Sequence, residues 1–141
     1  MKKRIPILLA LVCALLAMLF LGLWLHARQD ASQPETLARA GAQEAAARFA
    51  DFVAHGADGD YWGGVAAFHV FQQASALLPE QPGDAANRAI CSELYGALLL
   101  APAQAKPYAS ELAEILTCLS ENIRDRAAYE RLAVLRNALL H

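Results

Sequence analysis

The sequence predicts an all-α protein in which one N-terminal transmembrane helix precedes a small bundle of about five antiparallel helices, arranged as helical hairpins. Three observations predict this class. Residues 5–25 contain no charged side chain. Apolar residues in the later segments recur at the i, i+3, i+4, i+7 spacing of helices. No segment alternates polar and apolar residues for long enough to indicate a strand.

The uncharged stretch Ile5–Leu25 would form a helix about 31 Å long, which matches a bilayer core of about 30 Å. It is longer than the apolar core of a cleaved signal peptide and lacks a good small-residue cleavage site. These features favour an uncleaved signal anchor over residues 5–27. A cleaved signal peptide and a lipid-modified Cys13 are the alternatives.

Charges that flank this stretch predict its orientation. Lys2, Lys3 and Arg4 precede it, and only Arg28 follows it closely. The positive-inside rule then places the N-terminus in the cytoplasm of a single-pass cell-membrane protein. The predicted parts are a basic cytoplasmic tip at 1–4, the anchor at 5–27, a linker at 28–34 and an extracytoplasmic helical domain at 35–141.

The first helix of that domain is expected over 33–54. Ser32 and Glu35 form a capping-box pattern with Pro34 in the first turn, and Gly56 is a natural stop. The anchor and this helix could instead fuse into one long helix. The expected inner stripe is Ala38, Ala42, Ala45, Phe49, Phe52 and Val53.

Later helices follow in order. One is expected over 61–78 and ends before Pro79, and a second runs from its cap Asp84 to 100. A connector at 101–107 precedes a helix with strong apolar periodicity through 112–123, and Asp125 caps the last helix. The expected inward side chains are Tyr61, Trp62, Val65, Phe68, Val70, Phe71, Ala74, Leu77, Leu78, Ile90, Cys91, Leu94, Tyr95, Leu98, Leu112, Ile115, Leu116, Leu119, Ile123, Ala128, Leu132, Leu135 and Leu139.

The stretch HGADGDYWGG at 55–64 raises the question of a metal site. Asp58, Asp60 and Gly63 match positions 1, 3 and 6 of a calcium-binding loop. Trp62 stands at position 5 and His69 at position 12, where an oxygen ligand and a bidentate glutamate belong. The stretch is therefore predicted to be a turn, with Asp60 as the cap of the second helix.

A turn does not explain Gly63 and Gly64, the two glycines in the predicted first turn of that helix. Each costs about 1 kcal/mol against alanine, so either a close helix crossing or a ligand against the backbone should compensate, and packing is favoured. If Tyr61 and Trp62 are exposed, they are the best binding anchors in the chain. The candidate binding surface is Tyr61, Trp62, Gly63, Gly64 and His69.

Cys91 and Cys118 lie on consecutive helices at similar distances from the connector. They could form a disulfide in an oxidising exterior or remain two small buried thiols. No zinc-ligand spacing, nucleophile motif or phosphate-binding loop is present, so neither a cofactor nor an enzymatic activity is predicted.

Residues 30–141 carry fourteen acidic and eight basic side chains, a net charge of −6. Such a domain should not bind nucleic acid by neutralising phosphates. The last helix is locally basic and could dock on an acidic partner or on lipid head groups, or could be a solvated face with Arg126 and Glu130 paired at i, i+4. The candidate basic docking face is Arg124, Arg126, Arg131 and Arg136.

A short stretch resembles the second helix of a tetratricopeptide repeat: Gly59, Asp60, Tyr61, Gly64 and Phe68. Phe71 stands where that motif has a small residue, and the two hairpins are offset by about 47 residues instead of 34. The likeness covers eight to ten residues. It implies helical hairpins that present a groove, and no more.

The expected function is therefore protein interaction by a membrane-anchored adaptor. Ala10, Ala14 and Ala17 of the anchor could allow close packing with another span, and a homo-oligomer is a further option. The alternative is a tethered small-ligand binder with its pocket near Gly63, Gly64, Trp62 and His69. An adaptor needs an exposed apolar surface, whereas a binder needs a closed concavity with convergent polar groups.

Overall fold

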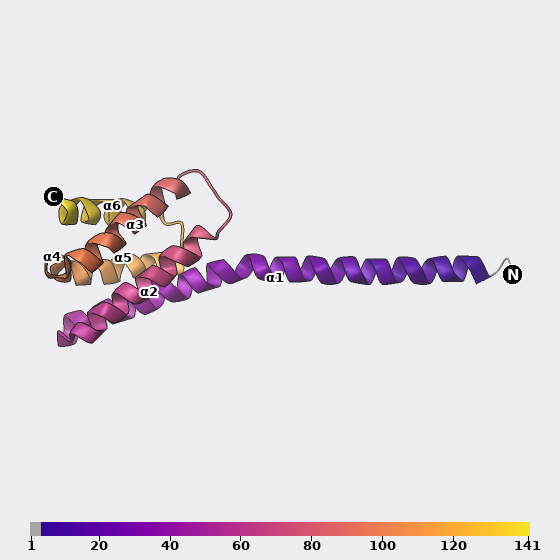
Figure 1. Cartoon of the computed structure of the whole chain (residues 1–141), viewed down its shortest axis with the longest axis horizontal. Helices are drawn as coiled ribbons and strands as arrows, with labels where there is room; N and C mark the ends of the chain where they lie inside the picture. Colours follow the sequence, from indigo (N-terminus) through magenta and orange to yellow (C-terminus); the bar gives the residue numbers. More distant parts are fainter. Residues whose placement is uncertain (1–3) are drawn as a thin grey trace. The chain divides into compact units, whose positions relative to one another are not determined.

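The computed structural model describes the backbone of residues 4–141 and the side chains of residues 16–24 and 32–141. The chain divides into two compact units, residues 1–33 and 34–141. Within the described residues the secondary structure is helical throughout (Figure 1). The prediction of an all-α bundle is confirmed. Its elements are α1 (Arg4–His55), α2 (Asp58–Ala76), α3 (Asp84–Leu100), α4 (Pro102–Ala105), the 3-10 helix η1 (Lys106–Tyr108), α5 (Ala109–Glu121) and α6 (Arg126–Leu140).

The first unit belongs to α1, which begins at Arg4. The predicted span at 5–25 lies largely outside the described side chains, as do the tip at 1–4, Cys13 and Arg28. In the part of the chain that is described, no helix combines the length and apolar character needed to cross a membrane. Large apolar side chains dominate residues 16–24, and all of them are exposed: Leu16, Met18, Leu19, Phe20, Leu21, Leu23 and Trp24.

The helical backbone of α1 continues through residues 28–34, where the sequence predicts a linker. Ser32 therefore lies inside a helix and cannot be an N-cap. The stretch contains no glycine, and its glutamine and alanine residues are compatible with a helix. The structure adopts the alternative of one long helix, with Pro34 inside it.

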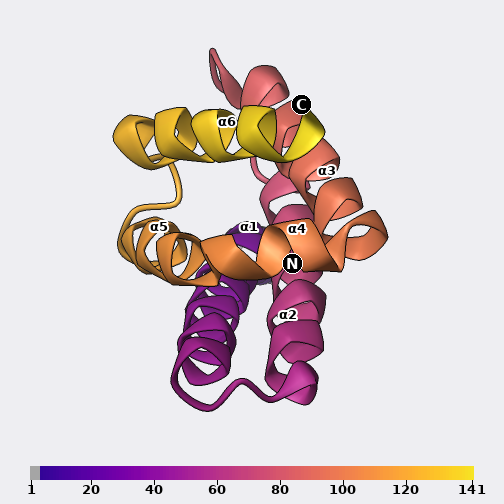
Figure 2. The ribbon, with the colours of Figure 1, turned by 90° about the vertical axis from the view of Figure 1, so that its left-hand side faces the viewer.

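Helices α1 and α2 lie side by side and are joined by a two-residue turn (Figure 2). Gly56 adopts a positive φ of 72° and its N–H donates to the Phe52 carbonyl, so the predicted glycine stop is confirmed. The prediction that Gly64 reflects close packing is also confirmed. A Cβ there would lie 2.9 Å from the ring of Phe49.

The core of residues 34–141 is assembled from α1, α2, α3, α5 and α6. Helix α3 packs against α2 and α6, and α5 packs against α6. The largest fully buried side chains are Tyr61, Phe49, Phe68, Phe71, Leu94, Leu98, Leu112, Ile115, Leu116, Leu119, Leu132 and Leu135. Most of the predicted inward residues are buried, but Val53, Trp62, Val70 and Leu77 are exposed. The apolar surface of α2 exceeds what its neighbours cover.

Two predicted caps are wrong and one is confirmed. Helix α2 begins at Asp58 after Ala57, so Asp60 lies inside the first helical turn and does not cap it. Gly83, with φ 97°, precedes α3, and the Asp84 carboxylate accepts a hydrogen bond from the Gln81 backbone N–H instead of capping the helix. Asp125 does cap α6, accepting from the Ala128 N–H at 3.1 Å.

The predicted connector at 101–107 is itself largely helical. It forms α4 and most of η1, because proline is well placed at the start of a helical turn. Pro102 begins α4 and Pro107 lies in η1. This compact segment carries Lys106 to the turn between α1 and α2, where it meets Asp58.

Candidate functional site

An open groove between α1 and α5 is the candidate functional site. Its volume is about 790 Å³. We call it the α1–α5 groove, and its lining residues are Gln43, Ala46, Ala47, Ala50, Val53, Ser110, Ala113, Glu114, Thr117, Ser120 and Glu121. Each helix contributes one face, since these positions recur at helical spacing.

The floor of the groove is made of small side chains. Ala46, Ala47 and Ala50 of α1 face the groove together with Ala113 of α5. Val53, at one end of the α1 face, is more than half exposed. Short side chains allow another helix backbone to approach closely, and they leave an apolar surface that water covers when the groove is empty.

The hydroxyl groups of Thr117 and Ser120 already donate hydrogen bonds to backbone carbonyls of their own helix. Thr117 donates to the Ala113 carbonyl at 2.8 Å, and Ser120 donates to the Thr117 carbonyl at 2.7 Å. A hydroxyl that donates in this way can still accept through its oxygen. These two side chains therefore offer acceptors to a ligand.

Carboxylates supply the charge of the groove. Glu114 and Glu121 belong to its described lining, which includes no lysine or arginine. Glu114 pairs with Arg131 of α6 at 3.1 Å. The backbone carbonyl of Glu121 accepts from Arg39 at 2.7 Å, but in the described part of the chain no cation pairs with its carboxylate. The groove is therefore acidic and rich in acceptors.

A second groove, of about 630 Å³, lies between α1 and α2. Its lining includes Gly59, Gly63 and Ala66 of α2, with Leu37 and Arg48 of α1. A Cβ on Gly63 would lie 3.3 Å from the Arg48 side chain, which is flexible and 47% exposed, so packing requires a glycine at this position less strictly than at Gly64. Glu44 and Arg48 pair across one turn at 2.8 Å, which leaves this groove without an excess of charge.

The residues of the predicted binding surface at 61–69 differ in burial and in contacts. Tyr61 is fully buried, and its phenol donates to the Leu98 carbonyl at 2.9 Å. Trp62 is 43% exposed and packs edge-on against Tyr61. His69 stacks on Tyr95 with ring centroids 4.6 Å apart, and its buried Nδ1 has no hydrogen-bond partner among the described residues. Gly63 lines the second groove, whereas neither Trp62 nor His69 lines either of the two grooves.

The 55–64 stretch comprises the end of α1, the two-residue turn at 56–57 and the start of α2, and a lysine contacts this turn region. Lys106 Nζ lies 2.6 Å from Asp58 Oδ1. The same ammonium lies 5.8 Å from the centre of the Phe52 ring and 5.6 Å from that of Tyr61. Asp58 therefore anchors a structural contact. Among the described residues, no group of three or more histidine, cysteine, aspartate or glutamate side chains could hold a metal ion.

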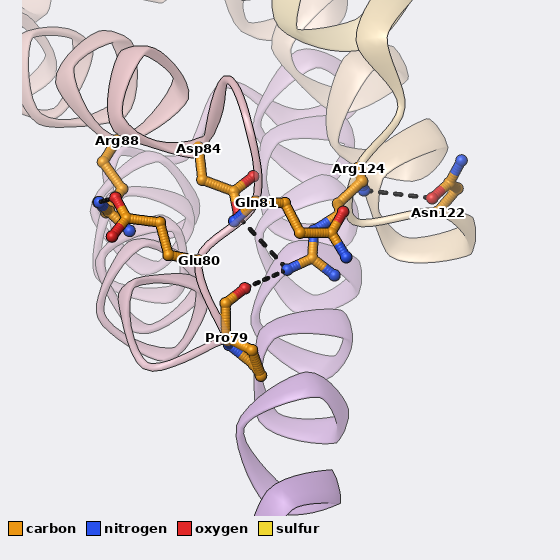
Figure 3. Close-up of polar contacts among 7 residues, drawn as sticks. All are labelled: Pro79, Glu80, Gln81, Asp84, Arg88, Asn122 and Arg124. Atoms are coloured by element: carbon orange, nitrogen blue, oxygen red, sulfur yellow. Dashed lines mark hydrogen bonds and ion pairs between the residues drawn. The ribbon is translucent and has the colours of Figure 1, made fainter.

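Each arginine predicted as part of a basic docking face pairs with a carboxylate. Arg124 donates to the Pro79 carbonyl at 2.7 Å and pairs with Asp84 at 3.3 Å, which connects the α2–α3 loop to the α5–α6 loop (Figure 3). The other pairs are Arg126–Glu130, Arg131–Glu114 and Arg136–Glu93, at 2.9, 3.1 and 2.8 Å. Among the described residues, a carboxylate therefore lies beside each of these four guanidinium groups.

Cys91 and Cys118 are both free thiols, the first buried and the second half-buried. Burial raises the pKa of the Cys91 thiol to about 12. The bridge that the sequence allows is not formed between these two residues in the structure.

The comparisons with known proteins give no family to which these features belong. No family model matches the chain, and neither a curated protein nor a solved structure is significantly similar to it.

The α1–α5 groove was not predicted from the sequence. Its signal is present as small residues at helical spacing: Ala46, Ala47 and Ala50 on α1, and Ser110, Ala113 and Thr117 on α5. Small residues alone do not indicate whether a face is buried or open, so the pairing of these two faces emerged only from the fold.

Proposed function

We propose that the chain is a single-pass membrane protein with a cytoplasmic N-terminus, and that its acidic helical domain lies outside the cytoplasm and binds another protein. The observation that carries the interaction role is the open, acidic α1–α5 groove. Its small apolar floor favours contact with a helix, and a rim of carboxylates favours a partner of opposite charge.

The exposed side chains at 16–24 support the membrane anchor. Seven large apolar residues lie within this stretch, and each is at least half exposed. Such a surface in water would be an aggregation liability, whereas a bilayer solvates it. The basic residues Lys2, Lys3 and Arg4 support the orientation.

Topology of the full chain tests this proposal. A C-terminal tag should be digested when protease is added outside intact cells, and the full-length chain should stay in the membrane after extraction at alkaline pH. The mass should equal that of the uncleaved chain. Release by alkaline extraction, a shortened chain, or a tag protected until the cells are lysed would each contradict the proposed anchor.

The interaction role is tested in the same membranes. A photo-crosslinking side chain placed at Ala47, inside the groove, should give a discrete adduct with one protein. The same group at Ala66, which lines the other groove, is the matched control. Equal adducts from both positions, or none from Ala47, would argue against a binding role for the α1–α5 groove.

A further inference from the structure

We infer that the α1–α5 groove binds a basic amphipathic helix of a partner protein, about three turns long, with cationic side chains seven residues apart. This inference rests on the proposed function, since it names the chemistry of the partner that the domain would bind. The dimensions, the hydrogen-bonding state and the charge of the groove support it in turn.

The dimensions favour a helix. The lining of α1 extends from Gln43 to Val53 and that of α5 from Ser110 to Glu121, so each face is about 15 Å long. A partner helix of about ten residues covers this length. A peptide strand would need a sheet edge to pair with, and residues 4–141 contain no strand. A polyproline II peptide would need an aromatic-lined groove, and the described lining contains no aromatic side chain.

Hydrogen bonding favours a partner that donates. The Thr117 and Ser120 hydroxyls already donate within α5, at 2.8 and 2.7 Å. Their oxygens can therefore only accept hydrogen bonds from a ligand in the groove, and the carboxylates of Glu114 and Glu121 are further acceptors. A ligand of lysine, arginine or amide side chains satisfies these acceptors, whereas an acidic ligand would leave them unpaired.

Charge then selects a basic partner. The described lining holds two carboxylates and no cation, in a domain whose net charge over 30–141 is −6. The Glu121 carboxylate has no cationic partner among the described side chains, and Glu114 shares only Arg131. Complementary charge of this kind steers association and fixes the register of the partner.

The spacing of the two carboxylates gives the pattern of the partner. Glu114 and Glu121 are two helical turns apart on α5, about 10.5 Å along its axis. Two cationic side chains seven residues apart on the docking helix match that separation. The stripe between them should be alanine or leucine, which pack on the small floor of Ala46, Ala47 and Ala50.

The test uses the full-length protein in lipid nanodiscs and a synthetic peptide of about 14 residues, capped at both ends, with an alanine and leucine stripe and lysines seven residues apart. Two control peptides replace the lysines by glutamate or scramble the sequence. Fluorescence anisotropy measures binding at low and at physiological salt. The lysine peptide should bind with micromolar affinity that weakens as salt increases, and the controls should bind at least tenfold more weakly.

Variants of the groove locate the binding. Glu121→Gln should weaken the lysine peptide about fivefold, and the pair Glu114→Gln with Glu121→Gln should weaken it more than tenfold. Ala47→Trp should abolish binding by filling the floor. Ala66→Trp, an equal change in the other groove, is the matched control and should leave the affinity unchanged. Circular dichroism confirms that each variant remains helical.

Several results would overturn the inference. Equal binding of the glutamate peptide would exclude a charge-selected partner. Equal losses of affinity from Ala47→Trp and Ala66→Trp would show that the peptide does not bind in this groove. A lack of binding by every peptide would also contradict the inference. Disruption of a dimer by Ala47→Trp would make a second copy of the chain the occupant. If no peptide binds but the membrane topology is as expected, the inferred partner is rejected. The proposal of a membrane-anchored domain is then unaffected.

Discussion

A Cβ atom on Gly41 would lie 2.7 Å from the backbone nitrogen of Phe71 and 3.0 Å from its Cα. The backbones of α1 and α2 therefore meet at this point with no room for a side chain. Gly64 repeats the arrangement against the Phe49 ring, farther along the same pair of helices. This close crossing sets the separation of the two helices that form the α1–α2 groove.

We therefore expect Gly41→Ala to destabilise the domain by roughly 1–3 kcal/mol, because backbone on the far side cannot move away as a flexible side chain could. Gly59→Ala is the matched control, since a Cβ there meets nothing within 4 Å. It should be neutral or stabilising by up to about 1 kcal/mol through helix propensity. Denaturant unfolding measures both. Similar stability of the two variants would refute the close crossing.

Tyr61 links stability to alkaline pH. Burial raises the pKa of its phenol from 10.0 to about 12. Because the folded state holds this proton more tightly than the unfolded state, the contribution is complete below pH 10.0 and is lost as the pH rises through about 12. Tyr61→Phe should cost about 1 kcal/mol at neutral pH, through the lost bond to Leu98, and should reduce the slope of stability above pH 10.0.

The control for that experiment is Tyr95→Phe, which keeps the ring that stacks on His69. Unfolding free energies are compared from pH 8 to 12 for the two variants and the parent. An unchanged alkaline slope in Tyr61→Phe would show that its phenol does not contribute to it.

Lys106 should stabilise the α1–α2 turn through both an ion pair and two aromatic rings. Lys106→Met removes the 2.6 Å pair with Asp58 and the contacts with Phe52 and Tyr61, and should cost about 1 kcal/mol. Asp58→Asn removes the pair alone and should cost less, since Asp58 is 70% exposed. A double-mutant cycle at two salt concentrations separates the contribution of the ion pair from that of the aromatic rings. Equal costs for the two single variants would eliminate the aromatic contribution.

Arg124 is expected to matter more than its neighbour Arg126. Its guanidinium bonds the Pro79 carbonyl and Asp84 in a partly buried position, so Arg124→Met should lower stability by about 1.5 kcal/mol or more. The side chain of Arg126 is 92% exposed in its pair with Glu130, and Arg126→Met should change stability by no more than about 0.5 kcal/mol. Thermal and denaturant unfolding measure the loss of stability in each variant. A larger loss from Arg126→Met than from Arg124→Met would contradict the contacts in Figure 3.

The two thiols of the domain should differ in reactivity. Because burial raises the pKa of Cys91 to about 12, little thiolate forms near neutral pH, and the sulfur is also inaccessible. In a Cys13→Ser background, iodoacetamide should modify Cys118 in the native protein and Cys91 only after denaturation. Mass spectrometry locates the label. Rapid native labelling of Cys91 would contradict its burial, and protection of both thiols until reduction would reveal a bridge.

Helix positions followed closely from local chemistry. The limits of α3 at Asp84 and Leu100, the stop at Gly56 and the cap at Asp125 depend on residues within a turn of one another. The periodic leucines and isoleucines of α5 were all buried as expected, because strict apolar periodicity leaves one orientation that hides them. Caps failed at Asp60, where the helix began earlier, and at Asp84, where the carboxylate bonded elsewhere.

The candidate site was far less predictable. Trp62 and His69 lie close in sequence to Gly63, but their rings contact Tyr61 and Tyr95 and do not line the groove that Gly63 lines. The arginines of α6 predicted a basic face, yet their carboxylate partners come from α3 and α5 as well as from α6 itself. Such pairings join residues far apart in the chain, and a sequence pattern does not contain their distances.

By itself the sequence determined that the chain is helical, which faces of its helices are apolar, and that an uncharged stretch precedes an acidic domain. These properties are local, since they follow from residue spacing, propensity and composition. Three features depend on how the helices pack: Gly41 meets the backbone of Phe71, Glu121 lines one groove with the alanines of α1, and each arginine of α6 is paired. Similar helix faces can pair in many ways, and the sequence pattern does not indicate which pairing packs best. Close contact distances depend on the pairing that forms.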